Sequence, residues 1–397
     1  MKLIRRHFYL EKLFRVMNTP DVKVITGIRR CGKSKLMEAF IDELRGRDAN
    51  ANVIHINFNM MEFEPLTEYH ALERYVNERY SGGKNNYVFI DEVQMCPSFE
   101  KAVNSLHASE KFDIYITGSN AFLLSSDLAT LFTGRTFEIK VFPFSFAEYM
   151  NYYQHADRYA ALDRYVEEGG MAGSYVYDTR EDKYAYINDQ VFNSLIVRDI
   201  RAKHKIRSSG VLDRLTDYLM DNIGNLTSVR RIEDVLKNAH VKASDKTLSA
   251  YIGHLCQAFA FYRLRRYDLR GKRYLASEDK YYLADQSFKY ARLGAKNMDY
   301  GRAYENIVAI ELLRRGYDVY VGKLYKNEID FVASRQSEKI YLQVSDDISR
   351  EETLAREVTP LLKIPDAYPK KLLARTRHAP YLHEGVEVCD IADWLSE

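Results

Sequence analysis

The stretch GIRRCGKS, residues 27–34, decides how the first part of this chain is interpreted. It follows a short apolar run, residues 22–26, and precedes a segment in which apolar residues recur at helical spacing between positions 36 and 44. The stretch matches the pattern Gly-x4-Gly-Lys-Ser, whose glycines allow successive backbone N–H groups to face a phosphate at a helix N-terminus. The sequence therefore predicts a P-loop, the Walker A motif of nucleotide-binding proteins.

The P-loop assigns a role to each of its residues. Lys33 is expected to reach the β- and γ-phosphates of ATP, and Ser34 is expected to coordinate Mg²⁺. We expect nine residues to contact the nucleotide: Gly27, Ile28, Arg29, Arg30, Cys31, Gly32, Lys33, Ser34 and Lys35.

A second motif, YVFIDEV at residues 87–93, supplies the acids that such a loop needs. Four apolar residues carry Asp91 to the end of a buried strand, where it can hold Mg²⁺ together with Ser34. Glu92 follows and can polarise the attacking water as a general base. The alternative is that an Asp-Glu pair after a strand is only part of a solvated loop.

Two further positions are candidates for sensing the γ-phosphate. The stretch IYITGSN, residues 114–120, ends a strand in polar groups, of which Thr117, Ser119 and Asn120 are candidates, with Asn120 or Ser119 favoured. Arg135 precedes the fifth strand and could reach a γ-phosphate in its own or a neighbouring subunit. The alternatives are a simple turn at residues 118–120 and an ordinary surface arginine. The predicted catalytic set is Glu92, Lys33, Asn120 and Arg135.

Strands and helices alternate through the first 145 residues. Apolar runs predict strands at 22–26, 53–58, 87–90, 114–116 and 137–141, with helical patterns between them. This alternation indicates an α/β fold with a parallel sheet and helices on both faces. Ligands of such sheets bind at the carboxyl ends of the strands, which is where GIRRCGKS lies.

With these elements in order, the N-terminal half resembles an AAA+ ATPase. Four stretches, at 25–34, 89–94, 116–124 and 131–149, more narrowly resemble a large prokaryotic family: ITGIRRCGKS, FIDEVQ, ITGSNAFLL and LFTGRTFEIKVFPFSFAEY. Members of that family join an AAA-type ATPase module to a C-terminal domain of unassigned function. The resemblance implies ATP hydrolysis and carries the ATP-site roles onto Lys33, Ser34, Asp91 and Glu92, but it names no substrate. AAA relatives often form rings, so a homo-oligomer is one expectation.

The middle of the chain predicts a helical lid and then a basic, winged-helix-like region. Residues 144–186 have helical spacing with a break at 168–171, and residues 196–208 are strongly basic. A helix capped by Ser244 follows, and then the basic stretch 259–275, FAFYRLRRYDLRGKRYL, which is typical of a two-stranded wing. In a winged helix the recognition helix enters the major groove and the wing contacts phosphates, so residues 196–275 are a candidate DNA-binding region. Binding to an acidic protein surface, or simple solvation, is the alternative.

The last hundred residues have the layout of a restriction-endonuclease-like fold. Glu305 lies on the apolar face of a predicted helix, and Asp330 lies in the strand EIDFVA, residues 328–333. The next strand ends in Gln343-Val344-Ser345, where active nucleases of this fold carry a lysine at the third position. By strand alternation Lys339 points to the same side, but it lies too far along the strand.

The missing lysine favours a degenerate nuclease-like module that binds nucleic acid or protein over one that cleaves. A structural role for Glu305 and Asp330, paired with arginines such as Arg314, is the alternative, because an acid on an apolar face needs a partner.

Composition limits the remaining possibilities. A chain of 397 residues predicts several domains, here 1–143 (AAA+ core), 144–195 (lid), 196–295 (winged-helix-like) and 296–397 (nuclease-like). The net charge is only +2, no apolar stretch approaches a membrane span, and the four cysteines form no CxxC pair. We expect a cytoplasmic ATP hydrolase without a membrane partner that couples nucleotide state to a C-terminal binding module. A slow signalling ATPase that controls protein assembly, and a metal-dependent nuclease, are the alternatives.

Overall fold

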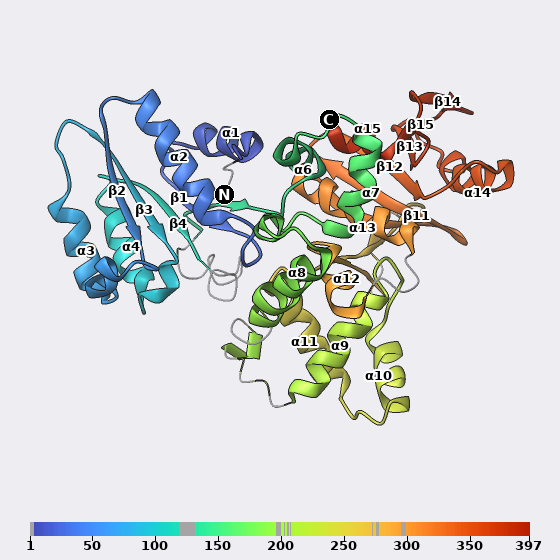
Figure 1. The fold of residues 1–397 in the computed structure, drawn as a ribbon, viewed down its shortest axis with the longest axis horizontal. Helices are drawn as coiled ribbons and strands as arrows, with labels where there is room; N and C mark the ends of the chain where they lie inside the picture. The colour runs from blue at the N-terminus through green and yellow to red at the C-terminus, as the bar shows by residue number, and fades with distance from the viewer. Residues whose placement is uncertain are drawn as a thin grey trace. The chain divides into compact units, whose positions relative to one another are not determined.

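The computed structural model describes residues 4–397 apart from 119–131, 133, 196–199, 202, 205, 207, 272, 275–277 and 295–298. The chain divides into two compact units, Met1–Val141 and Phe142–Glu397 (Figure 1). Within the described residues, none of the helices has the length and apolar character that crossing a bilayer requires.

The first unit is built on a five-stranded sheet in which every strand pair is parallel. The strand order is β2-β3-β4-β1-β5, which confirms the predicted α/β class. The strands are β1 (Val22–Thr26), β2 (Ala51–Asn57), β3 (Asn85–Asp91), β4 (Asp113–Thr117) and β5 (Thr136–Lys140). The helical segments are α1 (His7–Arg15), α2 (Lys33–Arg47), η1 (Met61–Leu66), α3 (Tyr69–Glu78), η2 (Val93–Met95) and α4 (Phe99–Ala108).

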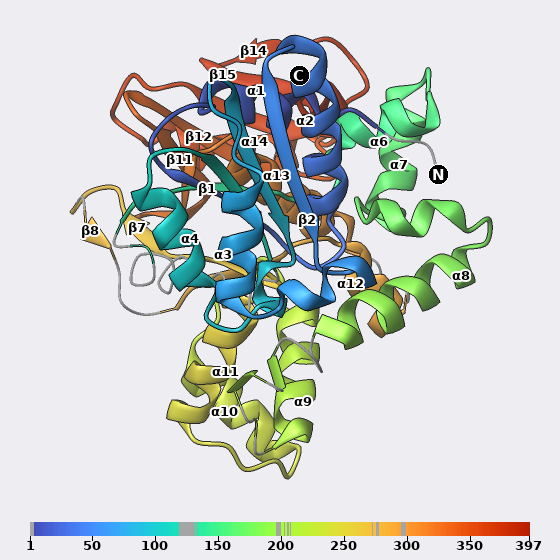
Figure 2. The ribbon, with the colours of Figure 1, turned by 90° about the vertical axis from the view of Figure 1, so that its left-hand side faces the viewer.

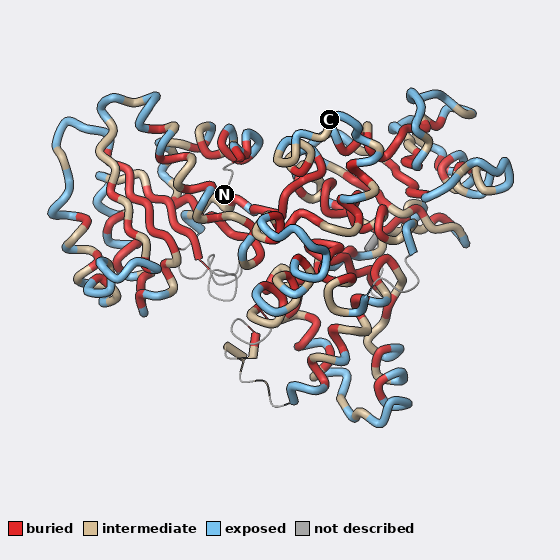
Figure 3. The backbone as a smooth tube through the Cα atoms, viewed as in Figure 1, coloured by how far each residue is buried: buried red, intermediate tan, exposed pale blue. Residues whose placement is uncertain are grey.

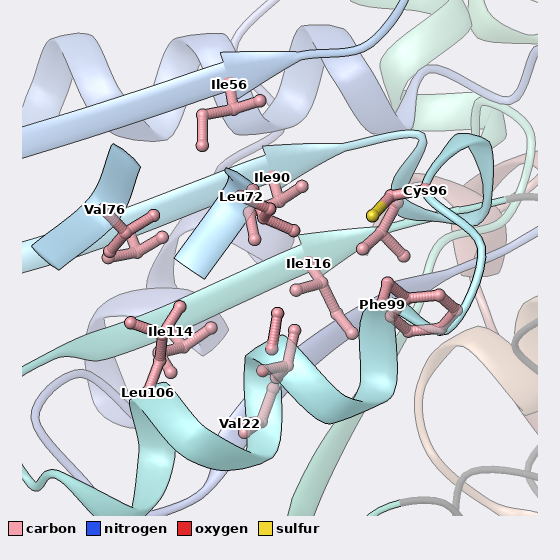
Figure 4. Close-up of a cluster of buried hydrophobic side chains, with 14 of the residues drawn as sticks. Val22, Ile56, Leu72, Val76, Ile90, Cys96, Phe99, Leu106, Ile114 and Ile116 are labelled. Atoms are coloured by element: carbon pink, nitrogen blue, oxygen red, sulfur yellow. The ribbon is translucent and has the colours of Figure 1, made fainter. Parts of the chain in front are cut away.

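Helices cover both faces of this sheet, which explains its continuous apolar strands. On one face, Val88 and Ile90 belong to a buried cluster that also includes apolar residues of α3 and α4 (Figure 4). On the other face, Phe89 stacks on Tyr115 with ring centroids 4.8 Å apart and meets Phe40 of α2 at 5.9 Å. Burial on both faces fixes the register of the strands and hence the positions of the loops at their ends.

The second unit begins with helices. The predicted break between lid helices is confirmed, because α7 ends at Glu168 and Gly169 follows with a positive φ of 70°. The Ser244 hydroxyl accepts a hydrogen bond from the Thr247 N–H at 3.3 Å, as expected for an N-cap. The helical segments here are α6 (Phe146–Tyr153), α7 (Arg158–Glu168), η3 (Ala172–Val176), α8 (Arg180–Ala185), η4 (Tyr186–Asn193), α9 (Ser209–Asp221), α10 (Val229–Asn238) and α11 (Asp245–Gln257); Figure 2 shows the last three as one group.

The strands after α11 match the predicted two-stranded ribbon only in part. β6 (Phe261–Leu264) pairs antiparallel with β9 (Lys280–Leu283), and Thr227 forms a bridge with Asp279 next to them. β7 (Arg266–Asp268) instead pairs with β8 (Arg273–Tyr274) and with a strand of the C-terminal sheet. Residues 259–275 thus contain one antiparallel strand pair, β7 with β8, while β6 takes its partner from residues 280–283. A wing formed by 259–275 stays a prediction.

The C-terminal sheet has eight strands in the order β14-β15-β13-β12-β11-β10-β7-β8. Its buried cluster lies between these strands and α14, and Figure 3 shows the buried strands in the centre of this unit. The strands not yet bounded are β10 (Asp318–Leu324), β11 (Asn327–Arg335), β12 (Glu338–Ser345), β13 (Lys370–Ala374), β14 (Tyr381–His383) and β15 (Val386–Asp390). The accompanying helices are α12 (Ser287–Leu293), α13 (Tyr300–Arg314), α14 (Glu351–Leu362) and α15 (Ile391–Ser396).

Candidate nucleotide site

Three of the predicted motifs share one edge of the first sheet. The P-loop follows β1, the acids follow β3, and Thr117 is the last residue of β4, which lies between these two strands. Because all the strands are parallel, their carboxyl ends meet at the same edge. The structure therefore brings the loop and the acids together, although they are some sixty residues apart in the sequence.

The P-loop depends on glycine at two positions. Gly27 has φ = 149° and Gly32 has φ = 99°, a backbone region that side chains disfavour. A Cβ added to Gly27 would lie 2.1 Å from the carbonyl oxygen of Val141, the residue after β5. The Val141 N–H in turn donates to the Thr26 carbonyl at 2.7 Å, so the loop and the end of β5 are fixed against each other.

Lys33 and Ser34 begin helix α2 directly after the loop. The buried Lys33 ammonium donates to the carbonyl oxygens of Gly27 at 2.9 Å and Ile28 at 3.2 Å. Ser34 is half-buried in the first turn of the helix. Both side chains therefore lie at the helix N-terminus, where the partial positive charge favours an anion.

Arg6 is a component of this site that sequence reasoning missed. The residue is only 4% exposed, and its guanidinium donates to the Cys31 carbonyl in the loop at 3.1 Å and lies 4.5 Å from the centre of the Tyr9 ring. Nothing in the sequence separates it from the basic residue beside it, Arg5. The contact depends on the position of α1 against the loop.

The two acids are linked by Thr117. The Thr117 hydroxyl donates to the carboxylate of Asp91 and accepts from the Glu92 N–H at 3.2 Å. Glu92 has φ = 55°, and its carboxylate accepts from the Gln94 side-chain amide. Of the three candidates in residues 114–120, Thr117 is thus the one with an observed contact to the acids, and the favoured Ser119 and Asn120 lie outside the described residues.

Arg135 lies at the amino ends of the strands, opposite the carboxyl ends that carry the P-loop. Its carbonyl accepts from the Val22 N–H at 3.0 Å, and Val22 is paired with Thr136 at the amino ends of β1 and β5. The length of β1, roughly 13 Å at the usual strand rise, separates this end from the P-loop. The placement does not support a γ-phosphate contact within the same chain, and a contact in a neighbouring subunit stays a prediction.

The predicted C-terminal acids meet a lysine instead of an arginine. Glu305 and Asp330 lie 2.8 and 3.8 Å from the ammonium of Lys280 in β9. Arg314, the partner considered from the sequence, pairs with Glu311. The ammonium of Lys339 lies 5.2 Å from the Tyr341 ring centre.

Other bonds complete this group of side chains. The Gln343 side-chain oxygen accepts from the Asp330 N–H at 2.7 Å, and the Ser345 hydroxyl donates to the Asp347 carbonyl at 3.1 Å. Among the residues with described side chains, no group of three or more His, Cys, Asp or Glu is arranged to hold a metal ion.

Several cations of the predicted DNA-binding region are already paired. Arg263 forms an ion pair with Asp279 at 2.5 Å, and Arg266 forms one with Glu278 at 3.1 Å. Arg201 pairs with Asp213 at 2.6 Å. Arg265 is exposed, and much of the basic stretch 196–208 lies outside the described residues.

Comparisons with known proteins place the first unit in a domain family and give a relative of the whole chain. Residues 19–150 match the AAA domain family, so this part of the chain is an AAA domain. A protein of Haemophilus influenzae described as uncharacterized is 35% identical over 399 residues, which cover 99% of this chain and 98% of that protein. The chain belongs to the same family as this protein. A protein of Methanocaldococcus jannaschii, MJ1544, is 26% identical over 336 residues, 80% of this chain and 73% of that protein.

Two further matches concern the rest of the chain and the fold. Residues 159–299 match a domain of unknown function (DUF8612). The Walker-type ATPase PABY2304 of Pyrococcus abyssi covers 73% of this chain and 95% of its own, with 18% identity and a TM-score of 0.46. The Orc1 protein of Aeropyrum pernix, in a structure with DNA, covers 79% and 94%, with 12% identity and a TM-score of 0.32.

Proposed function

We propose that this chain hydrolyses ATP with Mg²⁺ and that the nucleotide at the P-loop controls a nucleic-acid-binding module in the middle of the chain. The observation that carries the ATPase proposal is the shared edge of the sheet, which holds Lys33, Asp91 and Glu92 and where Thr117 bonds to the Asp91 carboxylate and the Glu92 N–H. The AAA domain match over residues 19–150 supports it.

Each residue at this edge has a chemical role in the proposal. When ATP binds, the Lys33 ammonium exchanges its two loop carbonyls for phosphate oxygens. The Ser34 hydroxyl and the Asp91 carboxylate fit Mg²⁺, a hard cation that takes oxygen ligands and, when bound, neutralises phosphate charge. Glu92 accepts the proton of the attacking water, and Gln94 holds its carboxylate in place.

ATP turnover by Lys33→Ala and Glu92→Gln tests the proposal. We expect Lys33→Ala to lose ATP binding, because the loop loses its cation. We expect Glu92→Gln to keep ATP binding and to lose roughly 10²–10⁴-fold in kcat, the usual contribution of a general base.

The matched control for Glu92→Gln is Glu78→Gln, which makes the same change at an exposed position of α3. Its kcat is expected to equal that of the wild-type protein. Unchanged turnover in Lys33→Ala, or equal losses in Glu92→Gln and Glu78→Gln, would overturn the proposal.

The binding module is proposed from the order of its elements and from its exposed cations. Helix α9, the Thr227 bridge, α10, α11 and the ribbon β6–β9 follow one another in the order of a winged helix. Lys246 and Ser249 are exposed near the start of α11, the proposed recognition helix. Other exposed cations of this region include Arg230, Arg231, Lys237, Lys242 and Arg265.

Charge reversal at Lys246 and Arg265 tests DNA binding. Arg266 is left unchanged because its reversal would also break the ion pair with Glu278. We expect the double variant to bind duplex DNA more weakly and to show a shallower salt dependence, by about 0.9 in log–log slope for each phosphate that the protein no longer neutralises. The control is Lys363→Glu, an exposed lysine after α14. A salt slope equal to that of the wild-type protein would contradict the DNA proposal.

A signalling ATPase is the second candidate function, and the paired arginines favour it. Arg263 and Arg266 are engaged by Asp279 and Glu278, which leaves fewer cations for phosphates. Such a protein would turn over ATP slowly, indifferent to DNA, and would control assembly with a protein partner or with further copies of itself. ATP turnover measured with and without duplex and single-stranded DNA separates the two candidates, since only the first predicts stimulation that Glu92→Gln abolishes.

The proposal also includes the fold relationship of the C-terminal sheet and the cellular compartment. The order α13-β10-β11-β12-α14-β13 supports a restriction-endonuclease-like relationship for the C-terminal sheet. The four cysteines are free, which fits a reducing compartment such as the cytoplasm.

A further inference from the structure

A buried lysine lies among three carboxylates in the second unit. The Lys280 ammonium lies 2.8 Å from an oxygen of Glu305, 2.8 Å from one of Glu328 and 3.8 Å from one of Asp330. The lysine side chain is only 3% exposed. Lysine is rarely buried unless it is paired, and here the partners come from α13 and β11 while the lysine comes from β9. We call these four residues the Lys280 cluster.

Two carboxylates of the cluster, those of Glu305 and Asp330, also accept hydrogen bonds from other groups of the protein. The Tyr282 hydroxyl donates to the same Glu305 oxygen at 2.6 Å, and the Val344 N–H donates to Asp330 at 2.9 Å. The two best-buried acids are thus satisfied by the protein itself, as buried charges must be.

The charged groups of the cluster shift one another's pKa. Although burial opposes it, the carboxylates of Glu305, Asp330 and Glu328 raise the pKa of Lys280, so this side chain stays charged. Burial, together with the nearby Glu305 charge, raises the pKa of Asp330 to about 8. At neutral pH the cluster therefore holds a permanent ammonium and tends to keep a proton on Asp330.

The same strand is fixed to α13 by a second polar contact. Asn306 is fully buried, and its side-chain oxygen accepts from the Leu283 N–H at 2.7 Å while its amide donates to the Leu283 carbonyl at 3.0 Å. Both backbone groups of Leu283 that face α13 are thereby paired. Two neighbouring residues of α13, Glu305 and Asn306, thus bind Lys280 and Leu283 at the two ends of β9.

We propose that Lys280 is a built-in cation that takes the place of a divalent metal in this cluster, so that the acids of the C-terminal sheet join it to the ribbon β6–β9 instead of binding Mg²⁺ or Mn²⁺. The ribbon continues directly from α11, so helices α10 and α11 and the C-terminal sheet are linked through buried charge. This inference goes beyond the proposed ATPase function and does not depend on it.

Binding of Mn²⁺ to the full-length protein without nucleotide tests this proposal. Binding is measured as the loss of the free Mn²⁺ signal in electron paramagnetic resonance. The variants are Lys280→Met, Asp330→Asn and the two combined. We expect wild-type protein and Asp330→Asn to bind Mn²⁺ equally, because Lys280 occupies the acids. We expect Lys280→Met to gain a Mn²⁺ site that binds at least tenfold more tightly than the wild-type protein does. The added Asp330→Asn is expected to remove this site.

Two results obtained with the wild-type protein and Asp330→Asn would overturn the proposal. Wild-type protein that binds Mn²⁺ through a site lost in Asp330→Asn would overturn the proposal. Cleavage of plasmid DNA by the wild-type protein with Mn²⁺, abolished in Asp330→Asn, would overturn it too and would make Lys280 the lysine that a nuclease of this fold requires. Neither comparison uses a Lys280 variant, so the proposal stays testable if Lys280→Met does not fold.

Thermal unfolding of conservative and paired variants supplies a second test. Lys280→Arg keeps the cation and is expected to lose less in Tm than Lys280→Met. Lys280→Met combined with Glu305→Gln is expected to lose less than the sum of the single losses, because the double variant leaves no unpaired charge between them. Lys289→Met, at a partly buried lysine of α12, is the control and should show additive losses with Glu305→Gln. Additive losses for Lys280 and Glu305 would overturn the proposal.

Discussion

At the scale of single residues, Thr117 connects the parts of the nucleotide site. Its hydroxyl is fully buried and has one partner on each side, the Asp91 carboxylate as acceptor and the Glu92 N–H as donor. One side chain at the end of β4 therefore positions both the proposed Mg²⁺ ligand and the residue that carries the proposed base. Valine has nearly the same shape but makes neither hydrogen bond.

We predict that Thr117→Val lowers kcat for ATP roughly 10- to 100-fold and leaves the ATP dissociation constant within about twofold. A hydrogen bond to a charged group contributes about 1.5–3 kcal/mol, and each 1.36 kcal/mol in the barrier corresponds to about tenfold in rate. Steady-state turnover and nucleotide binding are the measurements. Thr67→Val, which removes an exposed hydroxyl bonded to the Glu64 carbonyl, is the control. Equal kcat values for the two variants would show that Thr117 does not position the acids.

At the scale of elements, Asp285 connects the loop after β9 with the turn after α7. Its buried carboxylate accepts from the Gly170 N–H at 2.6 Å and from the Ser287 N–H at 2.9 Å. Burial raises the pKa of Asp285 to about 6, although these hydrogen bonds and the Arg314 charge oppose the rise. The folded protein therefore binds this proton more tightly than the unfolded chain does.

The raised pKa of Asp285 predicts that the second unit loses stability as the pH rises from about 4 to about 6. Above the folded-state pKa the buried carboxylate is ionised, and the contribution lost is on the order of 2–3 kcal/mol. Urea unfolding between pH 4 and pH 7 should show a slope of this sign, to which Asp330 also contributes, and Asp285→Asn should reduce the slope while lowering stability overall through a lost acceptor. Asp178→Asn, at an exposed position, is expected to keep the slope. A slope unchanged in Asp285→Asn would contradict the assignment.

How much the sequence could predict also depends on the element. The strands of the first sheet were predicted to within a few residues, because burial on both faces produces continuous apolar runs. The P-loop was predictable because its chemistry is local. The pairing of β6 with β9 was not, because the intervening residues are similarly basic and aromatic and nothing local distinguishes the two partners.

The Lys280 cluster shows the same limit for a site. Its acids lie 25 to 50 residues from the lysine, so no spacing rule links them. A signal did exist, since Lys280 begins an apolar run, KYYL, and a lysine buried in a strand requires a carboxylate partner. The identity of that partner depends on how β9 packs against α13, which only the structure provides.

At the scale of the whole molecule, the division into two compact units predicts that unfolding is not a single transition. ATP with Mg²⁺ should raise the midpoint of one transition, that of Met1–Val141, because the proposed site lies entirely within this unit and binding stabilises only the folded form. Differential scanning calorimetry with and without nucleotide measures this, and Lys33→Ala should abolish the shift. A single transition, or equal shifts of two, would contradict the prediction.

The close fit of Gly27 against Val141 has a mechanical consequence. Val141 is the last residue of the first unit, and its backbone is held by β1 and the P-loop: its N–H donates to the Thr26 carbonyl, and its carbonyl accepts from the Cys31 thiol at 3.3 Å. Its next peptide bond leads to Phe142, where the second unit begins. If ATP binding moves the loop, as the proposed function requires, the contacts of Val141 with Thr26 and Cys31 would carry that movement to the peptide bond where the second unit begins.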